Sequence, residues 1–334
     1  MRDGYPVLGR HIHLLAELAG EPCGQVEGWF ERHGVDPTTL FTCEVRSLIV
    51  AGRARQLGAG RRLLDALAAS ARTLAWGGAT ARAGVAAGAG AGAGADPGPP
   101  RAARCVLAAE VLEANPARSF YTRVGYAPGS HSARIESAAG ARPAGGAFCA
   151  RVALPRDALA VACLEGVLAE RRRSAGDLRF DRPRAVDATM VGAIAAHLGG
   201  ASRTAHAAGA AGAAGGADGA GAGAAQGGPF GDPLAIVALD RAGLVRASAA
   251  FTTHALEPPF ITMRRALVGR FALDPACPAG PLVAPMVALA CRMALSQGAP
   301  LVELTDLSAP GTPLHDAALA AGAQAWSSVM LKID

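Results

Sequence analysis

The first feature of the chain is an alternation of apolar and polar residues in segments 11–18 and 25–31, which are joined by the turn-forming residues AGEPCG. A period of two is typical of strands that bury one face of a sheet. A further apolar run follows at 43–50. We therefore expect a β-hairpin and a third strand in the same sheet.

After this run the apolar residues recur at a longer spacing. In segment 61–75, leucine and alanine recur at helical spacing, which predicts a helix with one buried face. Segment 104–112 predicts the next strand, and segments 132–136 and 148–154 predict a pair of strands that completes this first sheet. The first half of the chain is therefore predicted to be a mixed α/β unit.

A short helix is predicted within NPARSFYTRVGY, between these strands. Asn115 and Pro116 are typical of a helix start, because the asparagine oxygen can accept an unpaired amide and proline fits the first helical position. Gly125 is typical of a helix end.

The second half repeats this order of elements. Together the two halves predict an α/β protein of the α+β type, with two similar domains that each form a mixed, mostly antiparallel sheet flanked by helices. After a strand and a helix at 178–198, the expected elements are a hairpin and third strand, a helix, a strand, a short helix and a last strand, at 234–240, 244–254, 266–274, 282–295, 301–307, 312–323 and 326–333.

The chain has 334 residues, which is long enough for two ordinary domains. We expect domains at 1–156 and 178–334, with a linker helix at 157–177. The Ala/Gly-rich segments 84–103 and 199–228 have almost no large side chains and cannot bury enough apolar area to offset the entropy of ordering. They are predicted to be mobile inserts, one in each domain.

The net charge is +5, and the arginines are spread along the chain rather than gathered in one stripe. This distribution weakly favours an anionic small ligand and does not favour a nucleic-acid partner. No apolar run approaches the ~18 residues of a membrane helix, and the first residues lack the pattern of a signal peptide. We expect a cytoplasmic protein without a membrane partner, and the sequence does not predict its oligomeric state.

The seven cysteines form neither a CxxC pair nor a zinc-binding pattern, which indicates free thiols in a reducing compartment. His11 and His13 share a strand face, but two histidines without a third ligand are not typical of a metal site. The sequence therefore predicts no bound metal.

The candidate chemistry lies in VRSLIVAGRARQLGAGRRLL, where a predicted strand gives way to a helix. Helix N-termini bind anions through unpaired amides, and Gly58 and Gly60 would let a phosphate approach the main chain. A P-loop is excluded because GK[ST] is absent, and a dinucleotide site is disfavoured because Leu63 stands where a third glycine is needed. The loop alone leaves phosphate binding and a simple tight turn equally open.

Two segments together resemble the GNAT superfamily of N-acetyltransferases. VRSLIVAGRARQLGAGRRLLDAL is similar to the acetyl-CoA motif of that family, with its Arg/Gln-x-x-Gly-x-Gly/Ala loop at Arg55 to Gly60. The resemblance covers about residues 10 to 154, and the second half keeps the element order alone. NPARSFYTRVGY looks like the second family motif, through Asn115, Ala117, Phe120, Tyr121, Gly125 and Tyr126.

The resemblance implies acetyl-CoA as cosubstrate, with its pyrophosphate on the amides of the loop and its pantetheine arm paired with the backbone of Leu48 and Val50. It also implies that the Leu48 amide polarises the thioester carbonyl. Family members use the asparagine at the position of Asn115 both as a helix cap and as a CoA ligand, so both roles are implied for Asn115. The implied cofactor contacts are Leu48, Val50, Arg55, Gln56, Leu57, Gly58, Ala59, Gly60, Arg61 and Asn115.

Acetyl transfer to an amine requires a base for the ammonium group. Glu44 precedes the loop by a spacing similar to that of the base glutamate in some histone-type family members, and Glu110 is the other candidate. Strand alternation predicts that Glu44, Arg46, Leu48 and Val50 share one face. An exposed strand charge is the alternative interpretation of Glu44.

Tyr121 matches the tyrosine that in many family members protonates the departing thiolate, and a packed core aromatic is the alternative interpretation. We therefore expect an N-acetyltransferase that acts on a primary amine, in a small molecule or a protein. The strand and two helices that usually wall the acceptor site are apparently missing. A noncatalytic acyl-CoA-binding or scaffolding module therefore remains an alternative, and a dinucleotide-dependent oxidoreductase is a weaker one.

In the second half, Pro278, Pro281 and Pro285 remove amides from the loop that corresponds to the glycine loop. This predicts that the second half is a degenerate copy of the first.

Overall fold

The computed structural model forms two compact units. Unit 1 consists of Met1–Gly129 and Ser328–Asp334, and unit 2 of Ser130–Ser327. The structure describes residues 10–33, 40–87, 104–141, 146–175, 186–213, 234–255 and 264–333.

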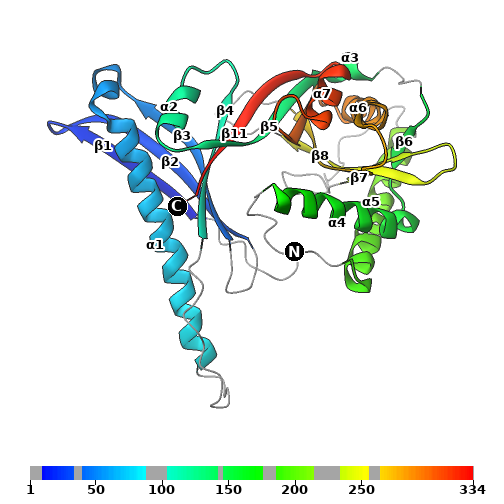
Figure 1. Cartoon of the computed structure of the whole chain (residues 1–334), viewed down its shortest axis with the longest axis horizontal. Helices are drawn as coiled ribbons and strands as arrows, with labels where there is room; N and C mark the ends of the chain where they lie inside the picture. The colour runs from blue at the N-terminus through cyan, green and yellow to red at the C-terminus, as the bar shows by residue number, and fades with distance from the viewer. Residues whose placement is uncertain are drawn as a thin grey trace, which may run out of the picture. The chain divides into compact units, whose positions relative to one another are not determined.

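Unit 1 is built on a mixed sheet with the strand order β1, β2, β3, β4 and β11 (Figure 1). The first three strands are antiparallel neighbours, and β4 is parallel to β3. The hairpin turn is shorter than expected, since Ala19 and Gly20 alone connect β1 to β2, both with positive φ. The strands are Arg10–Leu18 (β1), Glu21–His33 (β2), Leu40–Val50 (β3), Arg104–Leu112 (β4) and the end of Gln324–Ile333 (β11).

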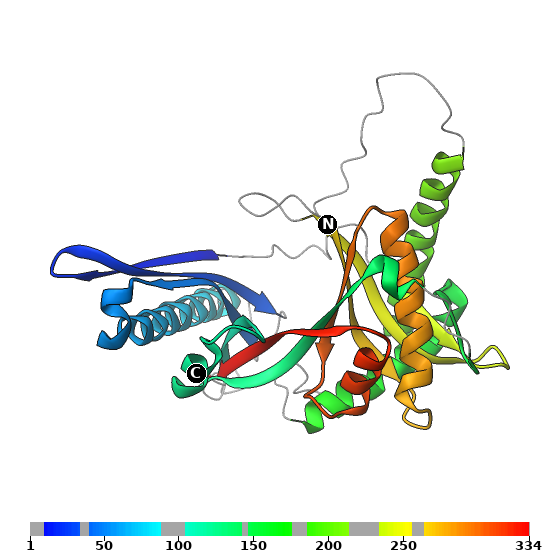
Figure 2. The ribbon, with the colours of Figure 1, turned by 90° about the horizontal axis from the view of Figure 1, so that it is seen from above.

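One long helix, α1 (Ala59–Ala87), covers a single face of this sheet (Figure 2). Its leucines and small alanines alternate at helical spacing, so one side packs on the strands, with Leu67 fully buried. Val26, Cys43 and Leu107 from three strands join the same cluster. Short helices η1 (Gly52–Leu57) and α2 (Arg118–Arg123) flank the carboxyl ends of β3 and β4.

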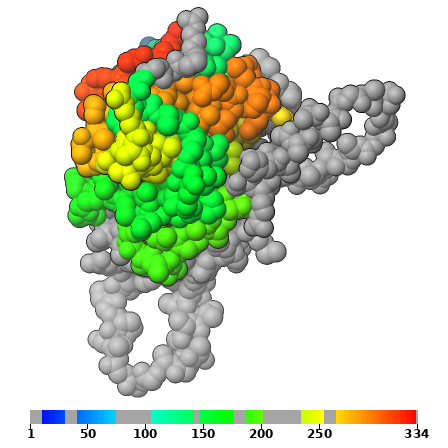
Figure 3. Space-filling view, turned by 90° about the vertical axis from the view of Figure 1, so that its right-hand side faces the viewer, coloured from blue at the N-terminus to red at the C-terminus, as the bar shows by residue number. Residues whose placement is uncertain are grey.

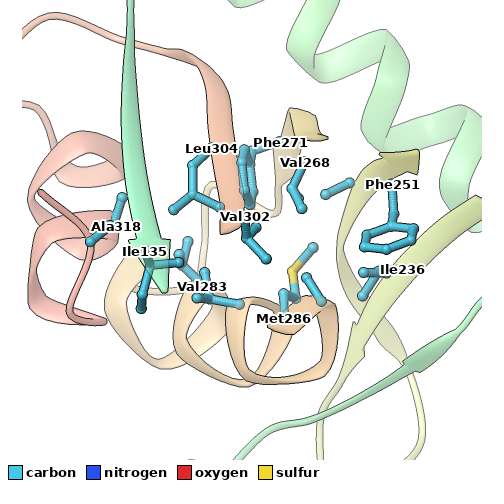
Figure 4. Close-up of a cluster of buried hydrophobic side chains, with 14 of the residues drawn as sticks. Ile135, Ile236, Phe251, Val268, Phe271, Val283, Met286, Val302, Leu304 and Ala318 are labelled. Atoms are coloured by element: carbon cyan, nitrogen blue, oxygen red, sulfur yellow. The ribbon is translucent and has the colours of Figure 1, made fainter. Parts of the chain in front are cut away.

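Unit 2 has helices on both faces of its sheet. α6 (Ala279–Ser296) packs on one face, where Met286 and Val283 belong to a core cluster with apolar residues of five strands (Figure 4). α4 (Ala158–Ser174) and α5 (Ala188–Ala213) pack on strands from the other side. The surface of this unit in Figure 3 includes the yellow turn between β7 and β8 and the orange residues of α6.

The strand order in unit 2 is β6, β7, β8, β9, β10 and β5. As in unit 1, three antiparallel neighbours are followed by a helix and a parallel strand, here β10 beside β9. The remaining elements are β5 (Ala127–Glu136), α3 (Ser137–Gly140), β6 (Cys149–Val152), η2 (Pro155–Asp157), β7 (Leu234–Leu239), β8 (Val245–Ala255), β9 (Arg264–Leu273), β10 (Leu301–Leu307) and α7 (Pro313–Ala320).

The predicted pairing of 132–136 with 148–154 is wrong. β5 pairs with β10, and β6 pairs with β7. A period of two identifies a strand and its buried face but not its neighbour, because any strand with a matching apolar face can be accommodated. As a result, 130–156 lie in unit 2 and 328–334 in unit 1, so the compact units divide the chain elsewhere than the predicted domain limits.

The two predicted inserts begin as helix. α1 extends to Ala87 and α5 to Ala213, so 84–87 and 199–213 are helical rather than looped. Alanine has the strongest intrinsic preference for helix, which explains why these glycine-containing segments continue a helix already begun. The rest of both inserts, and all but the last residue of the strand expected at 178–186, lie outside the described residues.

The turn after the parallel strand is repeated in detail. In unit 1 the Tyr126 amide bonds the Tyr121 carbonyl at 3.0 Å, and in unit 2 the Ala323 amide bonds the Ala318 carbonyl at 3.2 Å. Gly125 and Gly322 precede these amides with φ values of 93° and 95°. NPARSFYTRVGY and TPLHDAALAAGA therefore end in the same turn and can be aligned residue by residue, although α7 begins two positions earlier in its segment than α2 does.

α6 is the one described helix that is long and apolar enough to cross a membrane. Its buried residues belong to the core of unit 2, where Met286 and Leu282 are fully enclosed. We therefore interpret it as a core helix of this unit.

Candidate active site

The glycine loop forms a helix start with an open approach. Gly58 ends η1 in the left-handed conformation, with φ of 77°, and α1 begins at the next residue. The Arg62 amide bonds the Gly58 carbonyl at 3.1 Å, so the helical bonding begins there. The amides of Ala59, Gly60 and Arg61 precede this bond and have no carbonyl within the helix to bond. These three donors form the candidate anion site.

Gly60 allows the loop to pack closely against β3 and α2. A Cβ at Gly60 would lie 3.3 Å from the Phe120 ring and 3.5 Å from Val50 Cγ2, whereas nothing lies within 4 Å of a Cβ at Gly58. The loop therefore lies between the end of β3 and α2, with Gly60 against Val50 and Phe120. The approach to the main chain at Gly58 is open, as an anion at a helix start requires.

The arginines around the loop have different roles. Arg55 donates from Nε to the Val50 carbonyl at 3.1 Å, so its guanidinium fixes the end of β3. Arg61 lies 3.7 Å from Asp65 on the next turn of α1. Gln56 and Leu57 complete η1, and Leu57 is exposed. The positive charge near the helix start therefore comes from exposed side chains that also support the loop.

The backbone N–H and C=O groups of Leu48 and Val50 point away from β2. The Ala51 amide bonds the Cys23 carbonyl at 2.9 Å, and the register places Val50 opposite Gly24 and Leu48 opposite Val26. Opposed residues of antiparallel strands alternate between bonded and non-bonded pairs, so Leu48 and Val50 belong to non-bonded pairs. Their polar groups are directed to the side of β4.

On that side β3 and β4 separate. Their parallel pairing ends with Val45 opposite Ala109, although both strands continue beyond these residues. The Leu48 and Val50 backbone therefore forms a strand edge that the described part of β4 does not pair. An extended amide-containing chain such as pantetheine can bond to such an edge.

The prediction that Glu44, Arg46, Leu48 and Val50 share one face is wrong. The register shifts between Glu27 and Gly28 of β2, so Arg46 is an extra residue in β3. A β-bulge reverses the alternation beyond it. Leu48 and Val50 consequently pack on the α1 side with Cys43 and Val45, whereas Glu44 lies on the opposite face.

Glu44 is half-exposed and forms an ion pair with Arg46 at 2.9 Å. Glu110, in β4, is exposed and lies on the same face as Glu44, because its neighbours Ala109 and Val111 are buried in the α1 core. The geometry therefore places both base candidates on the face opposite α1.

Tyr121 projects from α2 into the core of unit 1 and is 8% exposed. Its ring makes edge contacts with Phe120 and Tyr126, at centroid distances of 5.5 and 5.3 Å. Burial raises the pKa of the Tyr121 phenol above its ordinary value of 10.0, since the phenolate is poorly solvated there. The phenol therefore keeps its proton at neutral pH.

Asn115 supports the turn that leads into α2. Its Oδ1 accepts the Ala117 amide at 2.9 Å, and its carbonyl accepts the Arg118 amide at 3.1 Å. The helix itself begins at Arg118, later than the sequence predicts. This arrangement gives Asn115 a turn-capping role.

Sequence reasoning missed a polar network beside Tyr121. Glu113, just after β4, forms an ion pair with Arg118, the first residue of α2, and accepts a hydrogen bond from Ser328 of β11 at 2.5 Å. Ser328 is fully buried. No local pattern connects a serine near the end of the chain with this motif, so the sequence could not have revealed the network.

The corresponding positions in unit 2 have lost these groups. Pro278 caps α6 and Pro281 lies in its first turn, at the position of Arg61 in α1, so one of the three donor amides is absent. Ala317, Ala318 and Ala323 replace the three aromatic residues of the repeated turn. Unit 2 therefore has one donor fewer at its helix start and lacks the aromatic residues.

His11 and His13 lie on the face of the sheet opposite α1. His11 bonds the Glu27 carboxylate, and His13 lies 3.4 Å from Gln25 Oε1. Within the described residues, no group of three or more His, Cys, Asp or Glu side chains is arranged to hold a metal ion.

The comparisons with known proteins give one match to a family model. Residues 5–89, which contain the hairpin, β3, the glycine loop and α1, match the family model described as the acetyltransferase (GNAT) family. The match lies within unit 1, and unit 2 repeats the order of elements of unit 1. No curated protein matches the sequence.

Solved structures of similar fold include a tandem GNAT protein from the clavulanic acid biosynthesis pathway. It has 15% identity and a TM-score of 0.45, with 99% of this chain and 84% of that chain covered. A GCN5-related N-acetyltransferase from Sphaerobacter thermophilus has 12% identity and a TM-score of 0.43, with 95% and 82% covered. TM-scores below 0.5 do not establish a common arrangement of the whole chains.

Proposed function

We propose that unit 1 is an acetyl-CoA-dependent N-acetyltransferase that moves the acetyl group directly to a primary amine. The observation that supports this most is the start of α1, where the amides of Ala59, Gly60 and Arg61 lie beside the unpaired edge of β3. Free amides at a helix start can bind a pyrophosphate, and an unpaired strand edge can bond to the amides of a pantetheine arm. The two features lie next to each other, as one ligand with both groups requires.

In this proposal the segment Leu57–Arg62 binds the pyrophosphate, and the backbone of Leu48 and Val50 aligns the pantetheine. The Val50 carbonyl is already bonded by Arg55, so the Val50 amide and the polar groups of Leu48 remain for the ligand. The Leu48 amide donates to the thioester oxygen as negative charge develops there. Arg55 contributes by fixing the strand end.

The reaction forms a nitrogen–carbon bond and breaks the carbon–sulfur bond. The ammonium group of the acceptor must lose a proton before the attack, and Glu44 is the proposed base. The departing thiolate gains a proton from the Tyr121 phenol, whose raised pKa keeps it protonated until that step. The acceptor is a small molecule or a protein amine.

A noncatalytic acyl-CoA-binding module is the second candidate. It is favoured by the Glu44–Arg46 ion pair and by the position of Glu44 on the face opposite Leu48 and Val50. Binding without turnover for any amine would support this module. Turnover that falls in Tyr121→Phe and Glu44→Gln while acetyl-CoA still binds would support the enzyme.

Calorimetry of acetyl-CoA binding tests the cofactor site. We expect the parent to bind and Gly58→Glu to bind at least tenfold more weakly, because a carboxylate would enter the open approach to the loop amides. Gly58→Ala controls for a side chain at the positive φ of this position, and Gly280→Glu controls for the same charge in the first turn of α6. If the parent does not bind, or Gly58→Glu binds as tightly as Gly58→Ala, the proposed cofactor site is wrong.

A further inference from the structure

The network around Glu113 connects the end of β4 and the start of α2 with β11, which is distant from both in the sequence. Its Oε2 pairs with Arg118 at the start of α2, and its Oε1 accepts from Ser328 in β11. The carboxylate is thus bonded on both oxygens by groups from different elements. Figure 1 shows α2 close to β4 and β11.

α2 also carries Tyr121, one turn beyond Arg118. The Tyr121 ring contacts Phe120 and Tyr126, and all three side chains pack in the core that includes fully buried Met330 of β11. A helix of this length has little stability of its own. Its orientation therefore depends on side-chain anchors such as the Glu113–Arg118 pair.

Unit 2 provides an internal comparison. In the repeated turn, Pro310 replaces Glu113, His315 replaces Arg118, and Ala318 replaces Tyr121. The same closing turn forms there without a carboxylate at this place, although α7 begins at Pro313, two residues before the counterpart of Arg118. The closing turn does not need the network to fold, and the network is present in the copy that has the tyrosine.

We infer that Glu113 is a positioning residue for acetyl transfer, which holds α2 against β11 so that the Tyr121 phenol faces the departing sulfur. This inference rests on the function proposed above. It assigns a role to the last strand as well, because Ser328 supplies one of the two bonds to Glu113. Unit 1 therefore requires the end of the chain for its full activity.

A double-mutant cycle tests this role. We expect Glu113→Gln to lower kcat by roughly tenfold with the KM for acetyl-CoA changed less than about twofold, because small displacements of a catalytic group reduce the rate without removing binding contacts. In the Tyr121→Phe background, Glu113→Gln should have almost no further effect on kcat. Asp240→Asn, which alters the comparable pair of Asp240 with Arg246 in unit 2, should leave kcat unchanged.

The possible outcomes separate the two proposals. Turnover by the parent with an unchanged kcat in Glu113→Gln, or multiplicative effects of Glu113→Gln and Tyr121→Phe, would overturn the positioning role alone. Absence of turnover in a parent that binds acetyl-CoA would overturn the enzyme proposal and this inference together. If Glu113→Gln does not fold, Ser328→Ala takes its place in the cycle, and a parental kcat in that variant would also overturn the inference.

Discussion

Tyr121 and Ala318 occupy the same position in two copies of one turn, and each carbonyl accepts an amide bond from the fifth residue beyond it. The backbone is therefore kept in both units, whereas the phenol exists in one. A group that the fold does not require at this place is a candidate for chemistry.

Tyr121→Phe should lower kcat by roughly 10²-fold, the lower part of the range for loss of a general acid, with little change in acetyl-CoA affinity. The ring and its edge contacts with Phe120 and Tyr126 are retained, so the fold should remain. Steady-state kinetics and calorimetry measure the two effects. Tyr126→Phe is the control, since it removes a phenol oxygen from the same aromatic cluster, and an equal loss of kcat in both variants would count against Tyr121 as the acid.

Met330→Ala should lower the free energy of unfolding by about 2–5 kcal/mol, the cost of a large cavity in a core. Met330 is fully buried among residues of unit 1, although it is the fifth residue from the end of the chain. Urea titration followed by circular dichroism measures this change. Leu15→Ala is the control, because Leu15 is 64% exposed and should change stability by less than ~0.5 kcal/mol.

Glu303→Gln should strongly destabilise unit 2. The Glu303 side chain is 5% exposed and accepts hydrogen bonds from Arg134 and Arg265, at 3.1 and 2.8 Å. Removing the charge leaves two partly buried guanidinium groups uncompensated, at a cost of about 3–5 kcal/mol. Denaturant unfolding measures the loss. Glu170→Gln, which alters an exposed pair with Arg173, should have little effect, and equal effects of the two variants would contradict this explanation.

Alkaline pH should destabilise the protein through Cys43. Burial raises the pKa of the Cys43 thiol from 9.0 to about 12, so the unfolded chain releases this proton first. The free energy of unfolding should then be constant below about pH 9 and fall as the pH rises toward 12. Urea midpoints at pH 8 and 10 test the sign.

The matched variants for this test are Cys43→Ala and Cys149→Ala. Cys149 is exposed, so its loss should leave the pH dependence unchanged. Cys43→Ala should reduce the dependence without abolishing it, because the buried Cys291 and Tyr121 also have raised pKa values. An identical dependence in the parent and in Cys43→Ala would show that the buried thiol is not responsible.

The sequence by itself determined the elements and the candidate loop. Periods of two and of three to four residues depend on local geometry, which is why β4 and β10 match their predicted ranges and α1 begins close to its expected start. Glycines at 58 and 60 mark a tight strand-to-helix turn for the same local reason, and Gly58 has the positive φ that favours glycine.

The tertiary structure decided which strands are neighbours and which side chains meet. β5 and β11 both have apolar faces that would suit either sheet, so their partners follow from the packing of the whole chain. The bulge at Arg46 reversed the expected face of Leu48 and Val50, because one extra residue in a strand leaves no clear mark in an apolar pattern. Ser328 meets Glu113 across almost the whole sequence, a contact that depends on the fold and not on any local pattern.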